Sequence, residues 1–193
     1  MVDRRGMQDH ADQGHVGRDH VGKDQVDRAR AQWAKELPDL DTGPMEVLGR
    51  IWRLSRLATP SIEATFASFG LDRGEFDVVG TLRRSGPPYR LTPTELYRSL
   101  MIASGSLTHR LGRLEKAGLV RRVPSENDGR SLAVQLTDEG VRRAEAAFRE
   151  DMASEADVIS SFDPDKRARL AALLRELTFA VEEQLGKRAG EEE

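Results

Sequence analysis

The segment SGSLTHRLGRLEKAGL, residues 104–119, constrains the fold more tightly than any other part of the chain. At about 100° per residue, Leu107, Leu111 and Leu114 stack into one narrow apolar stripe, which predicts a helix with a single buried face. The opposite face carries small and hydrogen-bonding side chains with one guanidinium: Gly105, Ser106, His109, Gly112 and Arg113. Because this face lacks the Glu and Lys mixture of an ordinary solvated helix, it can approach another polymer closely.

A shorter helix is predicted just upstream. Thr92, Pro93 and Glu95 fit a capping box with proline at the first helical position, and the helix continues through Leu100. Gly118 is placed to end the second helix as a C′ glycine. Two short helices joined this tightly, the second polar on its outer face, predict a helix-turn-helix whose second helix enters the major groove of DNA.

Residues 119–136 predict a β-hairpin after the second helix. An apolar and basic strand leads to a turn at Asp128-Gly129, and Arg130 follows just past the tip. The second strand alternates, with three apolar side chains on one face: Leu132, Val134 and Leu136. The fold class is therefore mainly α with a small β-hairpin wing, a winged helix-turn-helix.

The rest of the chain is predicted to be a polar tail and five more helices. The sequence predicts one domain over 24–193, in which Pro60 kinks or restarts a long helix and Asp72 and Glu75 cap the next. The predicted parts are a disordered polar tail at 1–23, an added N-terminal helix at 24–37, dimerisation helices at 45–70 and 138–187, and a DNA-binding region at 72–136.

The last predicted helix, which starts at Asp163-Pro164, carries an apolar stripe sustained over four turns. Its members are Leu170, Leu173, Leu174, Leu177, Val181 and Leu185. A stripe this long at the end of a small domain favours pairing with a second copy, and the alternative is packing on its own core.

Charge is unevenly distributed along the chain. Between Leu91 and Leu136 seven Lys and Arg face four Asp and Glu, a net charge of +3, whereas the whole chain carries −3, so the remainder carries −6. The segment expected to meet phosphates is thus the basic one. With no cysteine, the sequence excludes disulfides, thiolate zinc sites and a redox-sensing thiol.

The N-terminal tail carries His10, His15 and His20 at five-residue intervals. No helix face gathers this spacing, so a solvated tail is favoured over a metal site. We see no apolar run of transmembrane length and no signal peptide before the polar start, which predicts a cytoplasmic protein with no membrane partner.

Residues 91–140 resemble the winged helix of MarR-type bacterial transcription regulators. The D-x-R pattern of the wing is met by Asp128 and Arg130, and the following T-x-E-G by Thr137-Asp138-Glu139-Gly140. The resemblance implies a homodimer with intertwined terminal helices on a palindromic double-stranded DNA operator, with the wing arginine in the minor groove and Asp128 orienting it.

The predicted DNA contacts are Ser104, Ser106, Thr108, His109, Arg113 and Arg130. Alternatives remain for three of them: Ser104 could be the helix N-cap, Arg113 a partner of nearby Glu residues, and Arg130 part of an ordinary hairpin surface. The wing also reads Asp-Gly-Arg where many relatives have two arginines, which would remove one DNA contact.

Over nearly the whole chain the sequence also resembles the urate-responsive, HucR-like branch of the MarR family, whose members carry an added N-terminal helix. Four marker types stand at matching places: Trp33, Asp77, Arg110 and Arg122. The resemblance implies that Trp33 and Arg110 hold a planar anion. Repulsion between that anion and Asp77 would then shift the recognition helix through Arg110 or Arg122.

Each marker also has a plainer interpretation. Trp33 could be a helix anchor, Asp77 a surface acid beside Thr81, and Arg122 a phosphate contact. Arg110 lies about 60° from the leucine stripe, so it points sideways into the protein, where a salt bridge or a phosphate clamp would also explain it.

The sequence therefore predicts a repressor that a small anionic effector, urate first, releases from DNA. The alternatives are the same repressor responding to a phenolic acid or a tricarboxylate, and a constitutive DNA-binding protein without an effector. An enzyme is disfavoured, because His109 is the only histidine outside the tail and no catalytic triad, metal cluster or phosphate-binding glycine loop is visible; no cofactor is expected.

Overall fold

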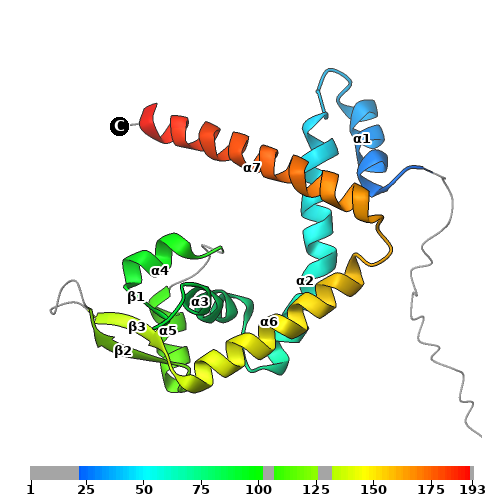
Figure 1. Ribbon diagram of the computed structural model, residues 1–193. Coiled ribbons are helices and arrows are strands. Elements are labelled where there is room, and N and C mark those ends of the chain that lie inside the picture. The colour runs from blue at the N-terminus through cyan, green and yellow to red at the C-terminus, as the bar shows by residue number, and fades with distance from the viewer. Residues whose placement is uncertain (1–21, 102–106, 126–131, 192–193) are drawn as a thin grey trace, which may run out of the picture. The chain divides into compact units, whose positions relative to one another are not determined.

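A computed structural model describes residues 22–101, 107–125 and 132–191 (Figure 1). The chain forms two compact units, one ending at Ser55 and the other beginning at Arg56. The described elements are mainly helices with one small antiparallel sheet, which confirms the predicted fold class. No helix within these ranges is long and apolar enough to span a membrane.

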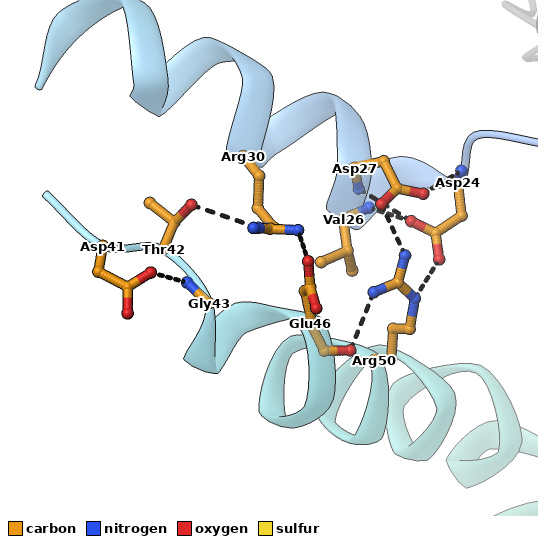
Figure 2. Close-up of polar contacts among 9 residues, drawn as sticks. All are labelled: Asp24, Val26, Asp27, Arg30, Asp41, Thr42, Gly43, Glu46 and Arg50. Atoms are coloured by element: carbon orange, nitrogen blue, oxygen red, sulfur yellow. Dashed lines mark hydrogen bonds and ion pairs between the residues drawn. The ribbon is translucent and has the colours of Figure 1, made fainter. Parts of the chain in front are cut away.

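The N-terminal unit contains α1 (Gln25–Glu36), the π-helix η1 (Met45–Gly49) and the start of α2 (Arg50–Ser68). Asp24 and Asp27 form the capping box of α1. Their carboxylates also bind Arg50, with Arg50 Nε 2.7 Å from Asp24 and Nη2 2.8 Å from Asp27 (Figure 2). The hydrogen bond from Arg50 lowers the pKa of the Asp27 carboxyl.

A second set of polar contacts joins α1 to the same segment. Arg30 Nε donates to Thr42 Oγ1 at 3.2 Å, and its Nη1 pairs with Glu46 (Figure 2). These bonds fold α1 back on the chain that enters α2. The helix α1 lies within the range predicted for the added helix, 24–37, and the segment predicted as a helix at 45–70 opens with a π-helix.

Pro60 lies inside α2, which continues through it as one helix. Of the two outcomes predicted for this residue, a kink or a restart, the restart is therefore wrong. A proline inside a helix removes one backbone hydrogen bond, and neighbouring packing can offset that cost. After Pro60, α2 contacts α6 through a hydrogen bond between the hydroxyls of Ser61 and Ser154, 2.9 Å long.

The C-terminal unit contains the predicted helix-turn-helix and wing. Its elements are α3 (Arg73–Arg84), β1 (Arg90–Leu91), α4 (Pro93–Ser99), α5 (Leu107–Lys116), β2 (Val120–Pro124), β3 (Leu132–Leu136), α6 (Asp138–Val158) and α7 (Pro164–Glu191). The sheet has the order β1-β3-β2, with Val120 opposite Leu136 and Pro124 opposite Leu132. The core lies between α3, α4, α5, α6 and this sheet, and its fully buried side chains include Leu82, Leu96, Leu114, Leu119 and Val134.

Both helices of the helix-turn-helix follow the sequence rules that predicted them. Thr92 and Glu95 form the capping box of α4, with Pro93 at the first helical position. Leu111 and Leu114 of α5 are buried, and Gly118 follows the helix with a φ of 70°. One strand residue differs from the prediction: Leu132 is 52% exposed, because it pairs with Pro124 at the end of the hairpin farthest from the core.

The junction between the wing and α6 explains the T-x-E-G pattern. Thr137 caps α6 by accepting a hydrogen bond from Gly140 N at 3.0 Å, and its hydroxyl donates to Gly118 O at 2.7 Å. A Cβ on Gly140 would lie 2.0 Å from the carbonyl oxygen of Leu119. Only glycine leaves room for this close approach of two backbones.

The apolar stripe of α7 is exposed in the single chain. Its side chains range from partly to largely exposed, at Leu170, Leu173, Leu174, Leu177, Val181 and Leu185. Phe148 and Met152 of α6 are exposed as well. The described chain therefore does not cover the stripe with its own core.

Asp151 is a buried carboxyl of α6, and its Oδ1 has no hydrogen-bond partner among the described residues. Burial raises its pKa, the charge of Glu155 raises it further, and Arg73 opposes both. Because the pKa of Asp151 is higher in the folded than in the unfolded protein, its protonated form contributes to the free energy of unfolding. That contribution is fully present below the unfolded pKa and is lost as pH rises through the folded pKa.

We therefore expect Asp151→Asn to stabilise the protein by about 1 kcal/mol at pH 7.5 and to lose that advantage below about pH 4. Urea unfolding followed by circular dichroism at both pH values measures the effect. Glu150→Gln, on the exposed side of α6, is the control and should change the midpoint little. Equal gains from both variants would contradict this account of Asp151.

Candidate nucleic-acid interface

The recognition helix α5 separates a buried face from an open one. Leu111 and Leu114 are in the core, whereas Thr108 and His109 are exposed. A Cβ placed on Gly112 would have no atom within 4 Å, so this part of the helix surface is open. Three other predicted DNA contacts lie outside the described residues: Ser104, Ser106 and Arg130. Asp128, which was predicted to orient Arg130, lies outside them as well.

Arg113, also a predicted DNA contact, is paired with two acids of α3. Its Nε donates to Glu75 Oε1 at 2.8 Å, and its Nη2 pairs with Asp72. Burial lowers the pKa of Arg113, but attraction to Glu75 and Asp72 outweighs this and the pKa is raised. The alternative that Arg113 is a partner of nearby acids thus describes its surroundings in the free chain.

Arg110 lies against the first turn of α3, as its place beside the leucine stripe predicted. A Cβ on Gly74 would lie 2.4 Å from Arg110 Nε and 2.5 Å from its Cζ, so the guanidinium covers this glycine. Arg110 is half-buried. Two arginines of α5, Arg110 and Arg113, therefore contact the same turn of α3.

Gly74→Ala is a probe of Arg110, because the added methyl group takes the space of its guanidinium. We expect a change in unfolding free energy of less than about 1 kcal/mol, since the guanidinium is at the end of a flexible side chain and alanine suits a helix better than glycine. If Arg110 binds the effector, effector titrations followed by DNA release should shift to higher concentration. Glu150→Gln, on the exposed side of α6, is the control. An unchanged effector response would contradict a role for Arg110 in effector binding.

Asp77, one turn further along α3, is buried and its Oδ1 accepts a hydrogen bond from Met101 N at 3.3 Å. It lines a cavity of about 630 Å³ between α3 and α6. The lining is largely apolar, with Phe76 and Phe148 stacked 6.3 Å apart, and it includes three arginines: Arg83, Arg84 and Arg149. An aromatic floor with guanidinium groups suits a planar anion.

The predicted effector residues do not all line this cavity. Only Asp77 does, while Arg110 lies on the first turn of α3. Arg122 on β2 is paired with Glu115, with Nε 3.9 Å from Oε2. Trp33 belongs to the N-terminal unit and is 47% exposed there. A shared effector site for the four stays a prediction.

The sequence interpretation missed the arginines of the cavity. Arg84 Nη2 donates to Thr81 Oγ1 at 3.0 Å and also contacts Ser99 O, which joins α3 to the end of α4. Arg83 pairs with Glu145 of α6 at 2.6 Å and lies over the ring of Tyr89. Both contacts with other helices join residues far apart in the sequence, so helical periodicity gave no signal for them.

Comparisons with known proteins agree with this architecture. The family model described as "MarR family" matches residues 69–131. The HTH-type transcriptional regulator PecS of Dickeya dadantii is 43% identical over 143 residues, covering 74% of this chain and 86% of PecS. The HTH-type transcriptional repressor YetL of Bacillus subtilis is 25% identical over 144 residues, covering 75% and 86% of the two chains.

Among solved structures, a mutant MarR from E. coli complexed with operator DNA matches with a TM-score of 0.59. It is 24% identical, and the match covers 75% of this chain and 96% of that one. That structure shares the fold of the winged unit described above. Together with the identity to PecS, these observations show that the chain belongs to the MarR family of winged helix-turn-helix transcription regulators, which are not enzymes.

Proposed function

We propose that this protein is a homodimeric repressor that binds a palindromic operator and is released by a small planar anion. The observation that carries the DNA-binding part is α5, which exposes Thr108 and His109 while burying Leu111 and Leu114. Such a helix can enter the major groove without losing its core contacts. YetL is described as a transcriptional repressor, and the similar MarR structure is a complex with operator DNA. Both support a DNA-binding role for this protein.

The dimer is supported by α7. Its exposed leucines and valine extend from Leu170 to Leu185, and burial of such a stripe in a two-fold interface is strongly favourable. A dimer also supplies two recognition helices, which a palindromic operator requires. Wing contact by Arg130, oriented by Asp128, and groove contacts by Ser104 and Ser106 remain part of the proposal.

The effector part is supported by the chemistry around α3. The cavity beside Asp77 offers aromatic rings and guanidinium groups, and Arg110 contacts the same helix one turn away. An anion near the Asp77 carboxylate would be repelled by it, and a shift of α3 would move α5, which is paired to it. Urate is the first candidate, held with help from Trp33 and Arg122; phenolic acids and tricarboxylates are the alternatives.

The proposal is tested by gel shift on the promoter fragment upstream of the protein's own gene, with urate, salicylate and citrate added in separate titrations. We expect a shift that urate removes and that persists with urate in Trp33→Ala and Arg110→Ala proteins. Release by another anion alone would replace urate as the effector. Retention of the shift with all three anions would instead favour a constitutive DNA-binding protein.

A further inference from the structure

The two acids that form the capping box of α3, Asp72 and Glu75, each use one carboxylate oxygen for the cap and the other for Arg113. Asp72 Oδ1 accepts from Glu75 N at 2.7 Å, and Glu75 Oε2 accepts from Asp72 N at 2.8 Å. The other oxygen of each acid pairs with Arg113 of α5. All four carboxylate oxygens therefore have donors, two within α3 and two from the recognition helix.

We infer that Arg113 is a positioning residue, which fixes the orientation of α5 on the first turn of α3 instead of contacting DNA. This inference rests on the proposed DNA-binding function. We call the three-residue cluster of Asp72, Glu75 and Arg113 the α3–α5 clamp.

The charge of the clamp argues against a phosphate contact. Two carboxylates around one guanidinium give the clamp a net charge of −1, and the Arg110 guanidinium over Gly74 brings this turn only to neutrality, so the cluster attracts a phosphate less than an arginine without acidic partners does. To bind a phosphate, Arg113 would have to leave its partners or bring the phosphate close to both acids. Glu75 is 8% exposed, so losing its cation would leave a buried charge uncompensated.

The geometry of the clamp argues for positioning. The buried leucine stripe of α5 holds the helix against the core, but apolar contacts have no preferred direction. A guanidinium bound through two of its nitrogens to two carboxylates is directional, and it resists rotation of α5 about its axis. Arg110, which covers Gly74 in the same turn, adds a second contact between these two helices.

The test is the salt dependence of binding to the promoter fragment, measured for wild type, Arg113→Ala, Arg113→Lys and the double variant Asp72→Asn with Glu75→Gln. Asparagine and glutamine each keep one oxygen for the capping box, so the double variant removes the charges and the acceptor oxygens that hold Arg113. We expect each variant to bind about tenfold more weakly at one salt concentration, with an unchanged slope of log affinity against log salt. Arg113→Ala combined with the double variant should bind no more weakly than Arg113→Ala alone.

A phosphate contact by Arg113 predicts different results. Arg113→Ala would then reduce the slope by about 0.9 per contact, or about 1.8 for a dimer, and lysine, which also binds phosphate, would keep both affinity and slope. The double variant would bind as tightly as wild type or more tightly. Any of these three results would overturn the positioning role while leaving DNA binding intact.

Two controls separate positioning from loss of folding and from loss of function. Glu139→Gln removes the charge of a partly exposed α6 acid that pairs with Arg142 and Arg143, and it should leave operator affinity unchanged. Thermal unfolding establishes that each variant is folded at the assay temperature. Variants that are less stable but bind DNA normally would overturn the inference, and a wild type that binds no DNA would overturn the proposed function with it.

Discussion

Leu173→Asp is expected to convert the proposed dimer to a monomer and to weaken operator binding by at least about a hundredfold. Leu173 lies in the stripe of α7 and is 60% exposed in the single chain. A two-fold interface would bury two new carboxylates, one from each copy, and each buried unpaired charge costs several kcal/mol. A monomer would reach only one half-site of the operator.

Size-exclusion chromatography with light scattering measures the mass, and gel shift measures operator binding. Glu176→Gln, also on α7 but polar in the wild type, is the matched control and should remain dimeric. If α7 instead packed on its own core, Leu173→Asp would lower the unfolding temperature without changing the mass of the folded protein. That result would contradict dimerisation through this stripe.

Gly140→Ala is expected to cost about 3 kcal/mol of unfolding free energy, which corresponds to a loss of roughly 6–12 °C in the unfolding temperature of a chain this long. The new Cβ would lie 2.0 Å from the Leu119 carbonyl oxygen. Because that oxygen belongs to the backbone at the start of the wing, no side-chain rotation can relieve the contact. The junction of β2, β3 and α6 would have to move.

Differential scanning calorimetry measures the loss. Gly112→Ala on the open face of α5 is the control, since its Cβ meets no atom within 4 Å and alanine favours the helix. It should leave the unfolding temperature unchanged or raise it slightly. A comparable loss in both variants would show that glycine is needed at 140 for a reason other than space.

The helix starts and the fold class could be predicted from the sequence because the signals that define them are local. The capping boxes at Asp72 and Thr92 each use residues three apart, and the leucine stripe of α5 lies within eight residues. Such short-range rules do not depend on the rest of the chain. The π-helix at 45–49 and the two-residue strand β1 had no comparable signal.

Interactions between distant residues could not be predicted in the same way. Arg113 was recognised as either a DNA contact or a partner of acids, but its partners lie 38 and 41 residues away in sequence. The contact of Arg110 with Gly74 depends on how α3 and α5 pack, although the helical angle predicted its sideways direction. The arginines of the cavity were missed for the same reason, because periodicity identifies a face and not its neighbour.

The three-stranded sheet has a further consequence for the solubility of a chain with so many exposed apolar side chains. Its order, β1-β3-β2, leaves β1 and β2 as the outer strands. Strand β1 is two residues long, and strand β2 carries Arg121 and Arg122 and ends at Pro124. Short length, positive charge and proline each discourage an added strand from another molecule. The edges of this sheet therefore add no second route of association to the exposed apolar faces of the helices.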